Sequence, residues 1–153
     1  MLPLEIKTSI QVSRSIAEVF NAIVDPDKMK NYFISQSSGI MKAGETLTWK
    51  FPEMDIEFPV RVDKIEKDKY ISFYWDGAFD GEQTFVEISL QTVADEITFI
   101  SISEKSKANN EAGIKWLKGN TEGWANFLAC LKAWMEYGVH LREGAFNPSQ
   151  MPV

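Results

Sequence analysis

The sequence predicts an α+β domain in which an antiparallel β-sheet packs against one long C-terminal helix. Three observations support this fold class. The chain opens on an alternating apolar pattern, continues with further strand patterns separated by short turns, and ends with an apolar stripe at helical spacing. The short connections favour antiparallel neighbours, because a parallel pair needs a crossover of roughly a dozen residues or more.

The first elements are a strand and two short helices. Residues 4–12 alternate between apolar and polar side chains, as a half-buried strand does. A short helical pattern follows and stops at Asp25-Pro26, since proline disfavours helical geometry in the residue before it. A second helical turn is expected over 27–31, with Met29 and Tyr32 directed towards the interior.

The middle of the chain reads as a series of strands bounded by turn-forming residues. Their expected ranges are 46–51, 56–65, 70–75, 82–90 and 96–104. Alternation places mostly apolar side chains on one face, which therefore requires a cover. This inward set is Leu47, Trp49, Phe51, Ile56, Phe58, Val60, Val62, Ile71, Phe73, Trp75, Thr84, Val86, Ile88, Leu90, Ile97 and Phe99.

The last third of the chain supplies that cover as an amphipathic helix. At about 100° per residue, the large apolar side chains between Trp116 and Met135 fall within an arc of roughly 120°. The firm part of this helix is expected from near Thr121, because two glycines weaken the turns before it. Its end is expected near Gly138 or Gly144.

Composition and charge restrict the class of protein. The 153 residues, 44% hydrophobic and 25% charged, can form one core, and we expect a single domain over 1–145 with a C-terminal tail over 146–153. The net charge of −6 makes nucleic acid an unsuitable partner. The apolar runs are far shorter than the ~20 residues of a membrane span. A single cysteine and the lack of a signal-peptide pattern predict a cytoplasmic protein.

Several short stretches, in order, are similar to a known family. They are Ser15-Ile-Ala-Glu-Val-Phe20 leading to Asp25-Pro-Asp-Lys-Met29, Ala43-Gly44-Glu45, Val62-Asp-Lys-Ile65 followed by Tyr70-Ile-Ser-Phe-Tyr-Trp75, and Glu122-Gly123-Trp124 ahead of Leu128 and Leu131. By their order and spacing, the chain resembles the Hsp90-ATPase-activator-homologue branch of the SRPBCC, or START-like, superfamily over nearly its whole length.

This resemblance implies the helix-grip fold, also called START/Bet v 1-like. In that fold a curved antiparallel sheet wraps around a long C-terminal helix, two short helices follow the first strand, and a hydrophobic cavity lies between sheet and helix. Tyr32 stands where many members carry tryptophan, which changes the shape or polarity of the cavity.

The inward aromatic residues are the candidate binding site. Each alone is typical of an ordinary core, but in the implied fold some of them are expected to surround a cavity for an apolar molecule such as a lipid or a polyketide-like compound. The candidate ligand-binding residues are Tyr32, Trp49, Phe51, Phe58, Phe73, Trp75, Trp124, Leu128 and Leu131.

Residues suited to catalysis are few. Cys130 and His140, if they share the last helix, lie about 15 Å apart along its axis and form neither a dyad nor a zinc site. Loop acids such as Glu53 and Asp80 are expected to be solvated. Glu104 could project inward as an acid or base, but the sequence shows no partner for it. We therefore assign no catalytic residue, no metal and no cofactor.

These observations leave three functional readings. The first is a binding protein for a small hydrophobic molecule. The second, which follows the family resemblance, is an interaction protein that stimulates an Hsp90-type chaperone ATPase, and the third is a cyclase-like or hydrolase-like enzyme that uses the same cavity. An open pocket favours the first reading and a buried polar cluster favours the third. An exposed edge strand could also pair two copies into a homodimer.

Overall fold

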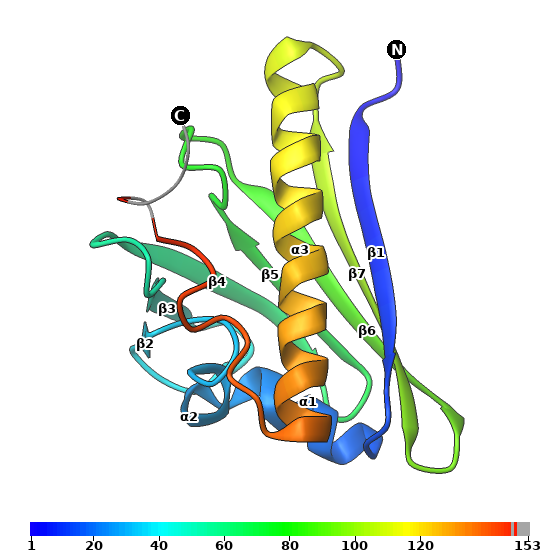
Figure 1. The fold of residues 1–153 in the computed structure, drawn as a ribbon. Helices are drawn as coiled ribbons and strands as arrows, with labels where there is room; N and C mark the ends of the chain where they lie inside the picture. Colours follow the sequence, from blue (N-terminus) through cyan, green and yellow to red (C-terminus); the bar gives the residue numbers. More distant parts are fainter. Residues whose placement is uncertain (148, 150–153) are drawn as a thin grey trace.

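The computed structural model describes residues 1–147 and 149, and it confirms the predicted fold class. Within these residues a seven-stranded antiparallel sheet curves around the long helix α3 (Figure 1). The strands are β1 (Leu4–Val12), β2 (Gln36–Ser37), β3 (Thr46–Lys50), β4 (Glu57–Glu66), β5 (Tyr70–Trp75), β6 (Thr84–Ala94) and β7 (Ile97–Lys107). The helices are α1 (Ile16–Val24), α2 (Pro26–Met29) and α3 (Glu111–Tyr137).

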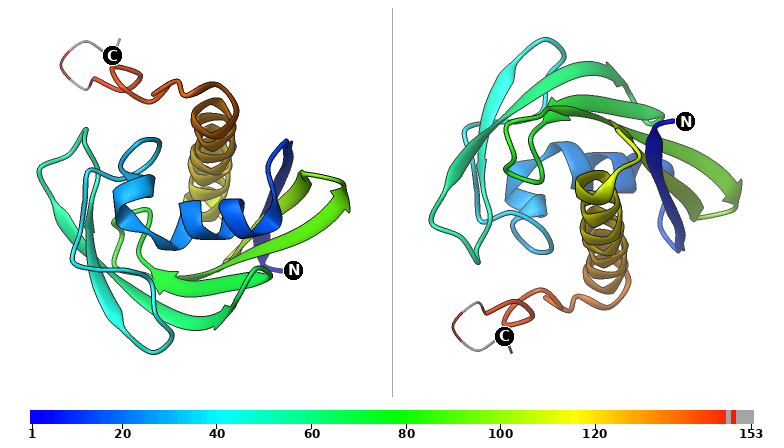
Figure 2. Two further views of the ribbon diagram at one scale, coloured as in Figure 1. Left: turned by 90° about the horizontal axis from the view of Figure 1, so that it is seen from below. Right: turned by 90° about the horizontal axis from the view of Figure 1, so that it is seen from above.

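The order of strands in the sheet is β1-β7-β6-β5-β4-β3-β2. Strands β2 to β7 form a continuous meander. The last strand, β7, pairs with the first, β1, which therefore forms the edge opposite β2. Figure 2 shows the sheet curving around α3 while α1 and α2 lie across one end. The helix thus lies on the concave side of a curved sheet, next to β1, which is the helix-grip arrangement that the sequence implied.

Side-chain caps begin each helix. The Ser15 hydroxyl accepts a hydrogen bond from the backbone N–H of Glu18 at the start of α1, and the Asp25 carboxylate does the same for α2. The Asn110 side chain accepts one from the backbone N–H of Gly113, so α3 begins at Glu111. Its firm part therefore starts well before Thr121, which corrects the expectation, because the cap and the burial of the first turns outweigh the weak helix propensity of glycine.

The end of α3 confirms one of the two predicted positions. Gly138 adopts a left-handed backbone conformation with φ of 65°, and its N–H is donated to the carbonyl of Trp134. The chain then leaves the helix axis and turns back beside α3, on the side of the molecule away from most of the sheet (Figures 1 and 2). This return brings the C-terminal segment, residues 139–147, next to the loop after β3.

The phase of the last strand differs from the prediction by one residue. Thr98, Ile100 and Ile102 are buried, whereas Phe99 is only half-buried. Ile100 lies opposite Leu90 of β6, and directly opposed residues of an antiparallel pair share one face of the sheet. Both sets of alternating residues in this strand contain apolar side chains, so alternation alone does not tell which set faces α3. The pairing with β6 decides it. Ile56 was also expected inward, but it precedes β4 and is 50% exposed.

The correct phase turns Glu104 towards the interior, where it is fully buried. It lies opposite Val86 of β6 and follows Ile100 and Ile102 on the same face. A carboxyl group at such a position requires hydrogen-bond partners, because burying a charge without them is costly.

Tyr32 is buried on the inner side, as predicted, and connects the α2 region to the helices around it. Its hydroxyl donates a hydrogen bond of 2.7 Å to the carbonyl of Ala22, and its ring contacts those of Phe127 and Trp134 on α3. Burial raises the pKa of the Tyr32 phenol well above its usual value.

No described helix combines the length and the hydropathy that crossing a bilayer demands.

Two glycines of α3 give a test of this packing. A Cβ added at Gly113 would lie 1.9 Å from the carbonyl oxygen of Ala108, whereas one at Gly119 would meet nothing within 4 Å. We expect Gly113→Ala to lower the free energy of unfolding by about 1–3 kcal/mol, because the backbone must shift. Gly119→Ala should raise it by about 0.5–1 kcal/mol through helix propensity. Urea denaturation of both variants measures the difference, and equal effects would contradict the packing described.

Candidate ligand-binding site

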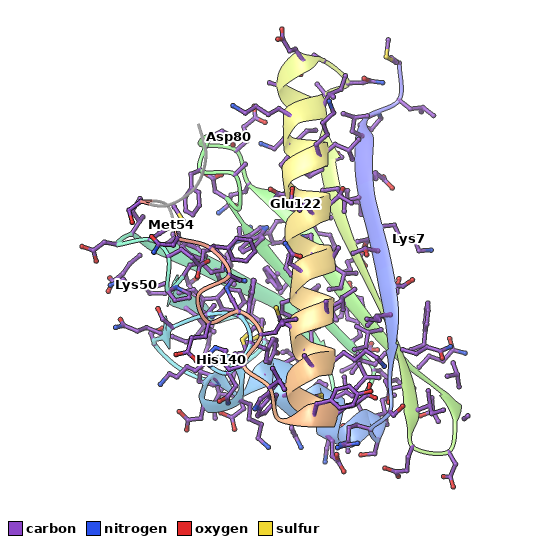
Figure 3. All side chains as sticks on the ribbon, viewed as in Figure 1. Lys7, Lys50, Met54, Asp80, Glu122 and His140 are labelled. Atoms are coloured by element: carbon purple, nitrogen blue, oxygen red, sulfur yellow. The ribbon has the colours of Figure 1, made fainter. Side chains whose placement is uncertain are left out.

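A pocket of about 340 Å³ lies between the β3–β5 part of the sheet, α3 and the C-terminal segment. Figure 3 labels Met54 on the loop after β3 and Glu122 on α3, which both contribute to it. The volume is within the range of small-molecule sites. The lining residues are Phe33, Phe51, Glu53, Met54, Trp75, Gly77, Gly119, Asn120, Glu122, Gly123, Trp124, Asn126, Arg142 and Phe146.

Two glycines on α3 create the space. Gly119 and Gly123 are four residues apart and so lie on one face of the helix. A Cβ at either position would meet no atom within 4 Å. From helix propensity alone, these residues are expected to weaken the helix. In the structure both are exposed and line the open side of the pocket, where the missing side chains leave it accessible.

Aromatic rings form the main wall of the pocket. The rings of Trp75 and Trp124 have centroids 5.3 Å apart, and Phe33 lies 5.8 Å from Trp124 and 5.1 Å from Phe51. Phe51 in turn is 6.4 Å from Trp75. These four residues therefore form a closed circuit of contacting rings from β5, the end of β3, the α2–β2 loop and α3. Such a surface suits an apolar or aromatic molecule.

Behind this wall, Glu104 binds both indole rings. One carboxylate oxygen, Oε1, accepts hydrogen bonds of 2.8 Å from Trp124 Nε1 and 3.1 Å from Asn120 Nδ2. The other, Oε2, accepts one of 3.0 Å from Trp75 Nε1 and a further one from the Thr84 hydroxyl. Indole and amide N–H groups only donate, so this set of partners matches a carboxylate, which only accepts. The ion pairs found among the described residues do not include Glu104.

The partners of Glu104 correct the sequence analysis, which found none. They come from β5, β6 and α3 and lie between 16 and 29 residues away along the chain. The available signal was the phase of β7, which places Glu104 in line with Ile100 and Ile102. Glu104 itself does not line the pocket. Trp75, Asn120 and Trp124 line it and also donate hydrogen bonds to Glu104. It is therefore a positioning residue for the pocket wall.

A buried ion pair closes the rim of the pocket. The Arg142 guanidinium binds the Glu53 carboxylate through Nη2 to Oε1 and through Nε to Oε2, the latter at 3.3 Å. The two side chains are only 9% and 13% exposed. The guanidinium carbon also lies 5.2 to 5.4 Å from the ring centroids of Phe33, Phe51 and Phe146. The C-terminal segment is thus anchored to the rim by one arginine.

Of the two loop acids expected to be solvated, Asp80 is exposed although it is also paired, whereas Glu53 is largely buried, which corrects the expectation for that residue. Glu53 is paired with Arg142, and Asp80 binds the buried ammonium group of Lys107. The hydrogen bond from Lys107 holds the pKa of the Asp80 carboxyl below its usual value. Both partners lie far away in the sequence, which is why the loop pattern did not reveal them.

Of the nine predicted site residues, the structure brings three to the pocket: Phe51, Trp75 and Trp124. The other six are buried in the surrounding core: Tyr32, Trp49, Phe58, Phe73, Leu128 and Leu131. Residues that the sequence analysis missed include Phe33, Asn120 and Arg142. Phe146, which was assigned to the tail, lines the pocket, whereas residues 148 and 150–153 lie outside the described part of the chain.

Cys130 and His140 do not meet in the structure either. Cys130 is buried on α3, where burial raises the pKa of its thiol, and His140 is exposed beyond the end of the helix. Among the residues described, no three His, Cys, Asp or Glu side chains gather as a metal site.

Comparisons with known proteins agree with this architecture. Residues 13–136 match the family model described as Activator of Hsp90 ATPase homolog 1-like protein. No curated protein matches the chain significantly in sequence.

Many solved structures share the fold, among them the following three. The protein SSP2350 from Staphylococcus saprophyticus is 29% identical, with a TM-score of 0.77 over 89% of this chain and 94% of its own. DynU16, from the dynemicin biosynthetic locus, is 22% identical with a TM-score of 0.77, covering 88% of this chain and 48% of its own. The Aha1 dimer from Colwellia psychrerythraea is 20% identical with a TM-score of 0.74, covering 88% and 98%.

The buried carboxylate gives the second test. In Glu104→Gln an amide N–H₂ faces indole and amide donors, which leaves at least one buried N–H unpaired. We expect the free energy of unfolding to fall by about 2–4 kcal/mol. Glu57→Gln, on the exposed side of β4, removes the same charge and should change it by less than about 0.5 kcal/mol. Urea unfolding of both variants tests this, and a Glu104→Gln protein as stable as the control would contradict it.

Proposed function

The chain belongs to the family of Activator of Hsp90 ATPase homolog 1-like proteins, and we propose that it binds a small, largely apolar molecule in the pocket between the sheet and α3. The observation that carries this proposal is the unfilled space at Gly119 and Gly123, opposite a wall of four aromatic rings. Gly119 and Gly123 are themselves exposed, so this space is an open, accessible pocket, and large rings along one side of such a pocket suit an apolar ligand.

The polar groups around the pocket are suited to orienting a ligand. Asn120 and Asn126 of α3 both line the pocket and offer amide donors and acceptors next to the rings. Asn120 is already held in place through its hydrogen bond to Glu104. A few fixed polar groups in an apolar surface are typical of small-molecule sites, where they decide which way the molecule lies.

The two buried carboxyl groups at the site are suited to structural roles rather than to acid–base catalysis. Glu104 forms the buried polar cluster that an enzyme would require, but its oxygens are occupied by four donors and it does not line the pocket. Glu53 is engaged by Arg142. A general acid or base must come within hydrogen-bond reach of the reacting atom, and neither group is free to do so.

A co-chaperone role is the second candidate, and family membership is the observation that favours it. The solved Aha1 dimer that shares this fold at 20% identity supports the architecture only. The two candidates are separated by measuring the ATPase rate of an Hsp90-type chaperone with and without this protein. The binding proposal expects no stimulation, whereas a rate that rises with protein concentration and saturates would favour the co-chaperone.

The binding proposal is tested on freshly purified protein. Native mass spectrometry followed by organic extraction should show an apolar compound bound in stoichiometric amount. Because Trp75 and Trp124 form the wall, a bound molecule should also change the tryptophan fluorescence. A mass equal to that of the bare chain, together with no fluorescence response across lipid and polyketide panels, would contradict the proposal.

Filling the pocket gives a matched pair of variants. Gly123→Phe places a ring in the open space, whereas Ala125→Phe adds the same ring to an exposed position of the same helix outside the pocket. We expect Gly123→Phe to weaken binding of an extracted or panel compound by about tenfold or more and Ala125→Phe by less than about twofold. Circular dichroism checks that both variants fold. Equal affinities would place the ligand elsewhere.

A further inference from the structure

The pocket carries more negative than positive charge. Its charged lining residues are Glu53, Glu122 and Arg142, and Arg142 is already paired with Glu53. The exposed carboxylate of Glu122 therefore remains at the rim. Behind the wall, the Glu104 carboxylate is fully buried and bound only by neutral donors. Charges in such a poorly solvated region act over longer distances than in water, so the interior of the pocket favours positive charge.

The aromatic rim already holds a cation, and that cation belongs to the protein. The Arg142 guanidinium lies within 5.5 Å of three ring centroids, those of Phe33, Phe51 and Phe146. This separation is within the reach of cation–π attraction, about 6 Å. The same guanidinium binds Glu53. Three rings of the pocket and one carboxylate thus form a seat for a positively charged group.

The segment that carries Arg142 is weakly tied to the rest of the fold. The described backbone hydrogen bonds of residues 138–145 run within the segment or to the last turn of α3. Space lies on both of its sides, because a second pocket of about 370 Å³ shares Phe33, Glu53, Arg142 and Phe146 with the first. Arg142 can therefore leave its seat without breaking a strand pairing.

Building on the proposed binding function, we infer that the pocket selects organic cations, molecules with an ammonium or guanidinium group on an apolar body, and that Arg142 competes with them for Glu53 and the surrounding rings. When a cation replaces Arg142, Glu53 keeps a positive partner and the guanidinium moves into water. An anion that paired with Arg142 would instead take away the positive partner of Glu53 and place a second negative charge beside it. Glu122 at the rim and Glu104 behind the wall would add to this repulsion. The charges therefore favour the cation over the anion.

Three probes with one hydrocarbon body test this selectivity: 4-phenylbutylammonium, 4-phenylbutan-1-ol and 4-phenylbutanoate. Their affinities for the wild-type protein are measured at pH 7 by calorimetry and tryptophan fluorescence. We expect the ammonium to bind about fivefold tighter than the alcohol or better, and the carboxylate to bind most weakly. Equal binding of all three, or tighter binding of the carboxylate, overturns the inference but leaves the binding function intact. Binding of none of them contradicts the proposed function and the inference with it.

Charge variants test the residues involved. Glu122→Gln should weaken the ammonium about two- to fivefold and leave the alcohol unchanged, whereas Glu66→Gln, exposed at the far end of β4, should change neither. Arg142→Gln should strengthen the ammonium by several-fold relative to the alcohol, since the competing cation is removed. If Arg142→Gln instead weakens binding of the ammonium relative to the alcohol, Arg142 does not compete with the cation and the inference is overturned. The alcohol serves as the reference for any general disturbance of the rim.

Discussion

The carboxylate of Glu104 connects the curved sheet to the long helix. Burying such a group costs several kcal/mol unless its lone pairs are satisfied. Here four donors satisfy them, and they come from β5, β6 and α3 while Glu104 itself belongs to β7. All four hydrogen bonds can form together only at one position of α3 along the sheet and one rotation about its axis. The cluster therefore specifies how α3 packs on the sheet.

The same hydrogen bonds shape the pocket. Because the indole N–H groups of Trp75 and Trp124 point at Glu104, their ring faces are held in one orientation along the pocket wall. Gly119 and Gly123 then leave open space on the helix beside this wall, where larger side chains would cover the pocket. A polar anchor beneath an apolar wall thus gives a rigid surface, which lowers the ordering cost of binding a ligand.

The rim of the pocket and its wall are held in place by different interactions. The wall rests on strands and on α3, whereas the rim depends on an ion pair and three rings that receive one arginine from a segment outside the sheet. Family membership agrees with the fold, but function depends on the particular groups at the site. In this chain those groups are a circuit of aromatic rings, an excess of carboxylates and a displaceable guanidinium.

The sequence by itself determined the element types, most of the strand faces and the amphipathic stripe of α3, because periodicities of two and 3.6 residues are local properties of the chain. It also placed Met29 and Tyr32 inside. Tertiary structure decided the phase of β7, since both of its faces are apolar and only pairing with β6 selects one. It likewise decided the partners of Glu104 and Glu53 and the space beside Gly119. Each of these depends on residues that are far apart in sequence and meet only once the sheet has curved around the helix.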